Sequence, residues 1–489
     1  MKKILALLGV ALVMLVAVVL VRALLFTSHH SVPIESASVA VDEAQITAHL
    51  VEAIRFRTIS TGNPETQSYD AFPRFTEWVK QTYPQMQTTM ELQMFGEHTM
   101  LYKWQGANPS LKPILLTSHY DVVPVVPGSE NNWEHPPFSG DIADGYVWGR
   151  GALDDKSAVV VMLEAATKLI QEGFVPQRTI YFSFGHDEEV GGPNGAANVV
   201  KHLKATGVQL AWTIDEGSFV SKDVVPGFNK PIASINVAEK GSVTLELIAS
   251  SAGGHSSLPA AEVSVDILAQ ALVSLRKHPI PGDIEGVSAE MFDSIARQGS
   301  FAVKLFVANQ WLFGDLMNRQ LSKNSYTNAL IRTTTAPTML RAGIKSNVIP
   351  PTANATVNFR LHPRDTPESV VAHVVAAIDD ARVEVRLQQE GMSTLASGVS
   401  SRESAGYKTI AKVAKMIFGD IIVVPGITVG GTDSKYYSQV ADDSYRFQFM
   451  LVGQEDTAGF HGTNERVAIS NLVKATQAYY LLMKLGASE

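Results

Sequence analysis

Acidic and imidazole side chains follow the apolar segments of this sequence, where they could form a reaction centre. They occur at residues 118–121, 149–156, 185–189 and 215–217, and again near the C-terminus at 459–465. In open α/β sheets, ligands collect beyond the carboxyl ends of the strands, so polar residues that follow an apolar run are the first to consider. The chemistry that such groups can supply is metal binding and proton transfer.

His119 and Asp121 are two residues apart, so on an extended chain their side chains point to the same side. Asp121 could therefore orient the His119 ring and set its tautomer. A histidine and an aspartate at this spacing are also ordinary polar loop residues, so the pair alone does not define a site.

Glu188 and Glu189 are adjacent, and adjacent residues at a strand end project in different directions. One carboxylate could bind a metal while its neighbour faces a water. Each acidic group also has an ordinary structural interpretation. Glu188 and Glu189 could form a solvated turn, Asp154 could lie at a helix N-terminus, and Asp215 could shape a turn before Gly217.

The sequence contains no cysteine, which excludes disulfides, thiolate metal sites and thiol nucleophiles. Any metal must be held by His, Asp and Glu. Carboxylates and imidazoles gathered at one sheet edge suit a binuclear Zn²⁺ site, in which one carboxylate bridges two ions about 3.5–4 Å apart. Such a pair activates a water, and a free carboxylate carries the proton.

The composition is that of a globular protein of two or three domains. The chain has 489 residues, of which 45% are hydrophobic and 18% charged. The net charge is −8, and the three charged residues among the first 26 are all basic, so the remainder is more acidic still. This balance argues against a nucleic-acid-binding surface.

An apolar run from residue 4 to 21 continues through 23–26 and is long enough to cross a bilayer. We expect residues 1–26 to be a transmembrane anchor rather than a cleaved signal, and 27–44 to be a tether. Lys2 and Lys3 place the globular part on the non-cytoplasmic side, in the periplasm, the lumen or the exterior. The alternative is a secreted protein.

The remaining chain alternates short apolar strands with amphipathic helices, which is typical of an α/β fold with a mostly parallel mixed sheet. Ser470 is expected to be an N-cap. The predicted strands are 114–117, 180–184, 210–214 and 421–424, and the predicted helices include 157–170 and 472–483.

A different pattern divides the predicted catalytic domain into two segments, 45–238 and 391–489. Residues 239–390, between them, contain period-2 strands and helices, which we interpret as an inserted α+β domain. Its predicted strands are 242–249 and 355–361, and its predicted helices are 263–276 and 367–379.

Taken together, these motifs resemble the co-catalytic zinc peptidases related to aminoacylase and glutamate carboxypeptidase, particularly carboxypeptidase S and the N-fatty-acyl-amino acid synthase/hydrolase. The likeness runs in order from about residue 45 to the C-terminus. It is carried by Ser118-His119-Tyr120-Asp121-Val122-Val123-Pro124, Trp148-Gly149-Arg150-Gly151 with Asp154, Asp187-Glu188-Glu189-Val190-Gly191-Gly192, Asp215-Glu216-Gly217, Gly254-His255-Ser256-Ser257 and His461-Gly462-Thr463-Asn464-Glu465.

The resemblance implies two zinc ions per subunit. It implies that His119 and Asp215 hold one ion, that Glu189 and His461 hold the other, and that Asp154 bridges them. In the family the inserted domain is a lid or dimerisation domain, so a homodimer is possible.

The resemblance also implies the catalytic roles. Glu188 falls at the general base, and Asp121 at the position that orients His119. His255 falls at the lid histidine that stabilises the oxyanion, often from a dimer partner. The peptide bond between Asp154 and Asp155 is expected to be cis.

Substrate binding rests on fewer residues. Alternation along 355–361 leaves Arg360 free to face a cleft, and the family uses an arginine there to bind the substrate carboxylate. Asn347 and the segment Gly430-Gly431-Thr432-Asp433 resemble further substrate-contacting positions, and the alternative for Thr432 and Asp433 is that they merely shape the turn.

Four aromatic residues lie in the inserted domain, at Phe301, Phe306, Trp311 and Phe313. They could line a pocket for an acyl chain. We expect them instead to be core or dimer contacts, which are the commoner roles of such residues.

The leading hypothesis is a zinc-dependent hydrolase of an amide bond next to a free carboxylate, acting by a two-metal activated water. It would be a carboxypeptidase, a dipeptidase or an N-acyl-amino acid hydrolase. The alternative is a membrane-tethered protein that binds peptides or acyl-amino acids without turnover. A third interpretation, zinc held only as a structural element, predicts a closed coordination shell without room for substrate.

Overall fold

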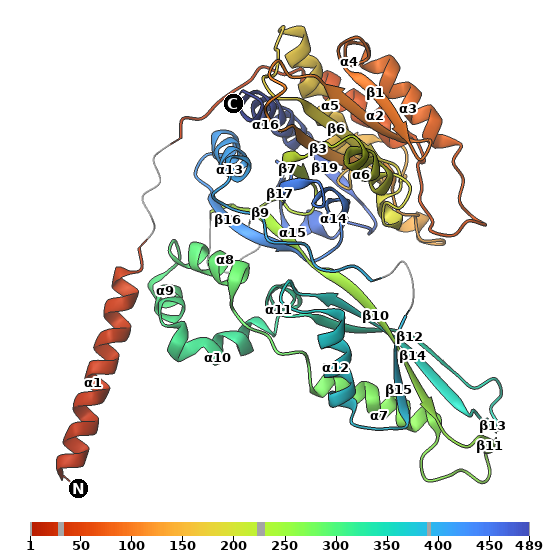
Figure 1. Cartoon of the computed structure of the whole chain (residues 1–489), viewed down its shortest axis with the longest axis vertical. Coiled ribbons are helices and arrows are strands. Elements are labelled where there is room, and N and C mark those ends of the chain that lie inside the picture. The colour runs from red at the N-terminus through yellow and green to blue at the C-terminus, as the bar shows by residue number, and fades with distance from the viewer. Residues whose placement is uncertain (1, 28–33, 223–229, 389–392, 489) are drawn as a thin grey trace. The chain divides into compact units, whose positions relative to one another are not determined.

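The computed structural model describes residues 2–27, 34–222, 230–388 and 393–488 (Figure 1). The chain divides into two compact units. The small unit consists of Met1–Thr27, Ala238–Val399 and Ile427–Gly430, and the large unit of Ser28–Val237, Ser400–Gly426 and Gly431–Glu489.

A ten-stranded mixed sheet forms the centre of the large unit, in the order β1-β2-β6-β3-β7-β17-β9-β8-β18, with β16 paired to β9. Strands β6, β3, β7 and β17 are mutually parallel, as predicted for the region that carries the chemistry. The bounds are β1 (Glu91–Phe95), β2 (Thr99–Trp104), β3 (Ile114–His119), β6 (Ile180–Gly185), β7 (Leu210–Asp215), β8 (Val220–Ser221), β9 (Ile232–Glu239), β16 (Ile422–Thr428), β17 (Ala441–Arg446) and β18 (Leu451–Val452).

The predicted strands at 114–117, 180–184 and 210–214 are confirmed as β3, β6 and β7, and 421–424 overlaps the start of β16. Every residue of β3 and β6 is buried, which explains their continuous apolar sequence. A three-stranded sheet lies beside the main one in the order β19-β5-β4, with β4 (Asp141–Ala143), β5 (Tyr146–Trp148) and β19 (Arg466–Ala468).

The two longest helices of the large unit are largely buried and contact each other, α5 (Lys156–Gln171) and α16 (Ile469–Gly486). Ser470 is not the N-cap of α16. Strand β19 runs directly into the helix, so Ala468 takes the cap position and Ser470 lies in the first turn. Other helices of this unit are α2 (Glu43–Arg55), α3 (Ala71–Thr82), α4 (Pro84–Thr89), α6 (Ala196–Ala205), α13 (Ala405–Phe418), α14 (Ser434–Tyr437) and α15 (Gln454–Thr457).

The small unit is built on an antiparallel sheet in the order β12-β14-β10-β15, against which α7 (Ser264–Lys277) and α12 (Pro367–Ile378) pack. Its strands are β10 (Gly241–Ser250), β12 (Thr334–Ala342), β14 (Thr352–Leu361) and β15 (Val383–Leu387). A short pair, β11 (Gly254–His255) and β13 (Val348–Ile349), and the helices α8 (Gly286–Ala296), α9 (Phe301–Ala308), α10 (Gln310–Leu321) and α11 (Ser325–Ile331) complete it.

The insertion expected at 239–390 falls within this small unit, and its expected end at residue 390 lies outside the described residues. Residues 28–33 of the expected tether also lie outside them. Helix α1 (Lys2–Leu25) groups with the small unit and is the one helix of the described chain that is long and apolar enough to cross a membrane.

Candidate metal centre

The candidate residues converge because three parallel strands end at one edge of the large sheet. Strand β3 ends at His119, which is in register with Gly185 at the end of β6. The chain after β6 forms a short 3₁₀ turn from Glu188 to Val190. Strand β7, on the other side of β3, ends at Asp215 and delivers Glu216. Polar groups far apart in sequence are thus gathered at a single sheet edge, as expected for an open α/β sheet.

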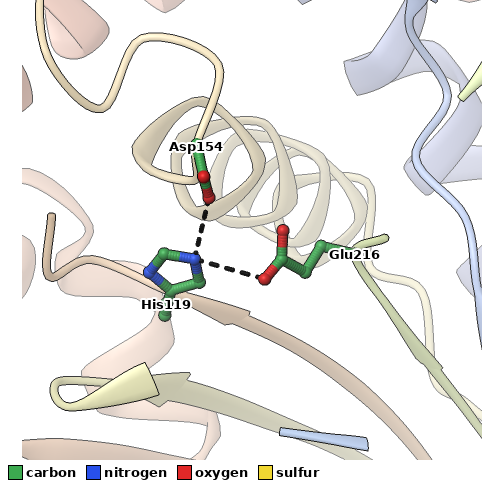
Figure 2. A group of neighbouring side chains, drawn as sticks. All are labelled: His119, Asp154 and Glu216. Atoms are coloured by element: carbon green, nitrogen blue, oxygen red, sulfur yellow. Dashed lines mark hydrogen bonds and ion pairs between the residues drawn. The ribbon is translucent and has the colours of Figure 1, made fainter. Parts of the chain in front are cut away.

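One half of the site is formed by His119, Asp154 and Glu216 (Figure 2). The Nε2 atom of His119 lies 3.1 Å from Oδ1 of Asp154 and 3.4 Å from Oε1 of Glu216. One donor atom from each residue lies within 4.8 Å of the others, close enough for all three to contact one cation. Only 1% of the His119 side chain is exposed.

The other half is formed by Asp154, Glu189 and His461. The Nε2 atom of His461 lies 3.2 Å from Oδ2 of Asp154 and 3.1 Å from Oε2 of Glu189. The two oxygens of Asp154 therefore face different histidines. This is the arrangement that a carboxylate bridging two cations requires.

Glu216, rather than the predicted Asp215, lies in the group of three around His119, and the ligand role of Asp215 stays a prediction. Asp215 is the last residue of β7, in register with Arg446 of β17, and its Oδ1 accepts the backbone N–H of Glu216 at 2.9 Å. Successive residues of an extended chain point to opposite sides, so the two carboxylates cannot share one side.

Asp121 supports both the histidine and the acidic turn. The Nδ1 atom of His119 lies 3.0 Å from the backbone oxygen of Asp121 and 3.3 Å from its Oδ1. The two carboxylate oxygens of Asp121 also accept the backbone N–H groups of Glu188 and Glu189, each at 3.2 Å. One buried side chain thus fixes the ring of a candidate ligand and the backbone of the turn that carries the candidate base.

Glu188 lies next to the candidate metal ligands but belongs to neither group of three. Its Oε2 is 4.0 Å from Nε2 of His119, at the limit of an ion pair. Burial is the main reason that the pKa of Glu188 is raised well above its usual value, with further contributions from neighbouring carboxylates such as Glu216. A carboxylate beside the candidate ligands, held ready to take up a proton, is suited to a general base.

Glu465 ends the last of the motifs but received no role from the sequence. It is fully buried, and its Oε2 pairs with Nη1 of Arg150 at 2.8 Å. Its other oxygen accepts the backbone N–H groups of Leu153 at 2.8 Å and Asp154 at 3.0 Å. The segment that presents Asp154 is therefore held from the far end of the chain. The expected cis peptide bond between Asp154 and Asp155 is confirmed.

The donor set fits a pair of hard or borderline cations. It consists only of imidazole nitrogens and carboxylate oxygens, the ligands that Zn²⁺ accepts where cysteine is absent. Among the described residues, the buried Oε1 of Glu189 has no hydrogen-bond partner, and an unpartnered buried carboxylate oxygen is costly unless it meets a positive charge.

Charge pairing across the site is strong. Hydrogen bonds to Asp154 and then Glu189 raise the pKa of His461 to about 10. Burial alone would lower the pKa of His119, but hydrogen bonds to Asp121, Asp154 and Glu216 outweigh it and hold that pKa well above the usual value. Burial raises the pKa of both Glu189 and Glu216. The carboxylates therefore retain protons on the histidines wherever no cation replaces them.

The expected substrate-binding residues lie mostly in the small unit. His255 is exposed in β11, where its Nδ1 is 2.7 Å from Oγ of Ser257, and the backbone oxygen of Asn347 accepts the N–H of Ser256 at 3.2 Å. Arg360 is exposed in β14, whose apolar residues alternate inward as expected. Gly430 and Gly431 follow β16, and Thr432 and Asp433 are buried.

The four aromatic residues do not lie in the core. Phe301, Phe306 and Trp311 are exposed, and Phe313 is half-buried. Of the two expected roles, core packing does not hold for Phe301, Phe306 and Trp311, since α9 has one fully buried residue and α10 has none, although several of their residues are half-buried. The alternative expectation, that they form a dimer contact, stays a prediction.

With this geometry in place, comparison with known proteins identifies the fold family. The sequence model of peptidase family M20/M25/M40 matches residues 115–485. This range contains every residue of both halves of the site. The chain belongs to this family. It is accordingly a hydrolase.

The sequence is similar to those of known proteins over nearly its whole length. The chain is 38% identical over 448 residues to a probable carboxypeptidase S-like 2 of Dictyostelium discoideum, covering 91% of this chain and 85% of that protein. It is 39% identical over 447 residues to the N-fatty-acyl-amino acid synthase/hydrolase PM20D1 of Xenopus tropicalis, covering 91% and 86%. The fold matches an M20 family metallo-carboxypeptidase of Sulfolobus solfataricus with a TM-score of 0.66 at 19% identity, covering 90% of this chain and 98% of that one.

Proposed function

We propose that the chain cleaves an amide bond next to a free carboxylate, with two zinc ions held at the candidate centre. His119 and Glu216 would hold one ion, Glu189 and His461 the other, and Asp154 would bridge them. The observation that carries the proposal is the division of the Asp154 carboxylate, whose two oxygens lie 3.1 and 3.2 Å from two different imidazoles.

The residues around the ligands divide the remaining work. The cations would polarise the amide carbonyl and lower the pKa of a coordinated water. Glu188 takes the proton of the attacking water and delivers it to the leaving nitrogen. Asp121 keeps the His119 ring and the Glu188 turn in place, since it contacts both. Glu465 holds the backbone that carries Asp154.

The proposed substrate is a small peptide or an N-acyl amino acid. The relatives divide between carboxypeptidase S-like proteins and N-fatty-acyl-amino acid synthase/hydrolases, and both kinds of substrate carry a free carboxylate beside an amide. Arg360 would bind that carboxylate, because a planar guanidinium matches its two oxygens. His255 would donate to the oxyanion, and Asn347, Gly430 and Gly431 would contact the substrate. The small unit would serve as a lid and as the surface of a homodimer.

We further propose that α1 is retained as an anchor, with the two units on the non-cytoplasmic side. The length of α1 supports this, since 24 residues rise about 36 Å and exceed the hydrocarbon thickness of a bilayer. A signal sequence that is cleaved on secretion is the alternative. The mass of the mature chain isolated from cells distinguishes the two, because cleavage removes α1.

Binding without turnover is the other candidate function. It gives no reason for a second carboxylate beside Glu189, since ligand binding alone does not need a proton carrier. The backbone N–H groups of Glu188 and Glu189 are nevertheless fixed by the same aspartate. This support of two carboxylates with separate roles favours catalysis.

The test combines metal analysis with a panel of dipeptides and N-acyl amino acids, applied to the wild type, Glu188→Gln and the exposed control Glu65→Gln. We expect two zinc ions per chain in all three proteins. Turnover by Glu188→Gln should fall by roughly 10²–10⁴-fold, the range typical of a general base, while the control should match the wild type. A Glu188→Gln protein with two zinc ions and full turnover contradicts the base assignment, and a wild type that binds substrates without cleaving them supports the binding function.

A further inference from the structure

Helix α9 has a composition that its surroundings do not explain. Seven of its eight residues are apolar, with Lys304 as the exception, and Ala308 is its one buried residue. A helix that is apolar on all sides is normally enclosed by protein or by lipid. Among the described residues α1, α8 and α10 contact α9, yet Phe301, Ala302 and Phe306 remain exposed.

The apolar surface continues onto the next helix. No residue of α10 is buried, and 57% of Trp311 is exposed. We call the exposed apolar side chains of both helices the α9–α10 surface, which consists of Phe301, Phe306, Trp311, Leu312 and Leu316. Single exposed apolar residues are ordinary, but a contiguous group marks an interaction site.

The α9–α10 surface is fixed to the last turns of α1. The Nε atom of Arg22 donates to the backbone oxygen of Ala308 at 3.0 Å, and the Nδ2 atom of Asn309 donates to the backbone oxygen of Val19 at 3.0 Å. Val19 and Ala23, which are buried although most of α1 is exposed, lie within this same contact region. The two helices are therefore held together by polar contacts as well as packing.

A second contact, from α8, holds the end of α1. Arg297, just after α8, donates from Nη1 to the backbone oxygen of Thr27 at 3.0 Å, and its guanidinium lies 4.2 Å from the centre of the Phe26 ring. The contact region thus extends from Val19 to Thr27, which is the end of α1 away from Lys2 and Lys3. In a membrane-spanning α1 this end lies at the non-cytoplasmic interface.

We infer that the α9–α10 surface is a second membrane contact, lying in the interfacial layer of the same bilayer that α1 enters. The argument for lipid is continuity with α1. Helix α9 packs against the end of α1 that would lie at the membrane interface, so the exposed apolar side chains of α9 would lie in the same lipid environment as that end. Trp311 suits this layer, where tryptophan is enriched, and Lys304 can extend its ammonium group to the headgroups. The inference rests on the proposed retention of α1 as an anchor and does not depend on the proposed amide hydrolysis.

Site-directed spin labelling tests this directly, because the chain has no cysteine to interfere. Single cysteines are introduced as Phe306→Cys and Trp311→Cys in the full chain, labelled with a nitroxide and reconstituted in phosphatidylcholine and phosphatidylglycerol vesicles. Matched controls are Leu258→Cys and Ile344→Cys, whose native side chains are 84% and 98% exposed in the same unit.

We expect labels at 306 and 311 to be relaxed several-fold more by oxygen, which partitions into lipid, than by a water-soluble nickel chelate. The controls should show the reverse preference. Nickel accessibility at 306 and 311 equal to that of the controls would overturn the inference. So would spin–spin broadening at these sites that disappears on dilution with unlabelled chain, since it would show a contact between two copies.

A second measurement covers the case in which one substitution prevents folding. Leu316→Cys replaces the failed variant, and a fluorescent label at the same position is quenched by lipids brominated along the acyl chain. Quenching at 316 above that at 344 supports the membrane contact, and equal quenching contradicts it.

Discussion

His119 and His461 contact opposite oxygens of the same carboxylate, yet the fold supports them differently. His119 ends a buried strand, is 1% exposed, and has its second ring nitrogen held by Asp121. His461 lies between α15 and β19 with a backbone φ of 54°, and 58% of its side chain is exposed. Its ring is placed by the carboxylates of Asp154 and Glu189.

In the His119 half, the histidine ring is held in place by a group that is not a candidate metal ligand. In the His461 half, the ring is positioned only by the other candidate metal ligands. A histidine whose far nitrogen is hydrogen-bonded has its ring orientation and tautomer fixed before a cation arrives. A positive φ is uncommon for a residue with a side chain, so the loop geometry at His461 is held by its surroundings. We therefore expect the cation at the His119 half to be bound more tightly than the one at the His461 half.

Removing each histidine should have the largest effect and should separate the halves. His461→Ala is expected to keep one zinc per chain at the His119 half and to lose roughly 100-fold or more in kcat/KM, because a catalytic cation contributes several kcal/mol. His119→Ala should retain less zinc and unfold at lower temperature, since the buried carboxylates lose their imidazole. Zinc per chain and thermal unfolding measure both, and equal behaviour of the two variants would remove the proposed asymmetry.

Asp215 and Glu216 give a matched pair of variants at adjacent positions, which tests which of them is the ligand. Glu216→Gln should lower the zinc affinity of the His119 half by at least about 10–100-fold. That is the loss in affinity usually seen when a group that supports a metal ligand is removed. Asp215→Asn, on the opposite side of the chain, should weaken it less. Zinc competition titrations compare the two. The reverse order would favour Asp215 as the ligand.

Asp121→Asn tests whether preorganisation accounts for the difference between the halves. We expect zinc affinity at the His119 half to fall about 10–100-fold, the usual effect of losing the group behind a metal-binding histidine. Zinc affinity at the His461 half should change less, because the His461 ring is positioned by Asp154 and Glu189 and not by Asp121. Stepwise chelator titration resolves the two affinities, and an equal decrease in both would show that Asp121 acts only through the fold.

Acid should weaken cation binding at both halves. Hydrogen bonds to Asp154 and Glu189 raise the pKa of His461 to about 10, and hydrogen bonds to neighbouring carboxylates also raise that of His119, so at pH 7 a cation must displace a proton from each ring. Affinity therefore falls as the pH is lowered, roughly tenfold per pH unit for each proton displaced. Zinc affinity and proton release measured between pH 6 and 8 test this, and activity should fall together with zinc content. Activity that persists after zinc is lost would contradict the proposal.

Much of the site could be predicted because it depends on strand ends. His119 and Glu189 follow apolar runs that form parallel neighbours, and His461 and Asp154 lie in motifs that resemble those of the family. The sequence does not separate Asp215 from Glu216 as a ligand, because the distinction depends on where β7 ends, and one residue reverses the side to which a side chain points.

Other features could not be read from the sequence because they depend on distant contacts. The role of Glu465 depends on Arg150 and on the backbone of Leu153 and Asp154, more than 300 residues away. The exposure of Phe306 and Trp311 depends on how little of α9 and α10 is covered, which composition alone does not reveal.

The most direct test of the central claim is an anomalous difference map at the zinc edge from crystals of the zinc-loaded chain. The account predicts two peaks about 3.5–4 Å apart on either side of the Asp154 carboxylate, one beside His119 and Glu216 and the other beside Glu189 and His461. A single peak, or two peaks that do not share Asp154, would contradict it.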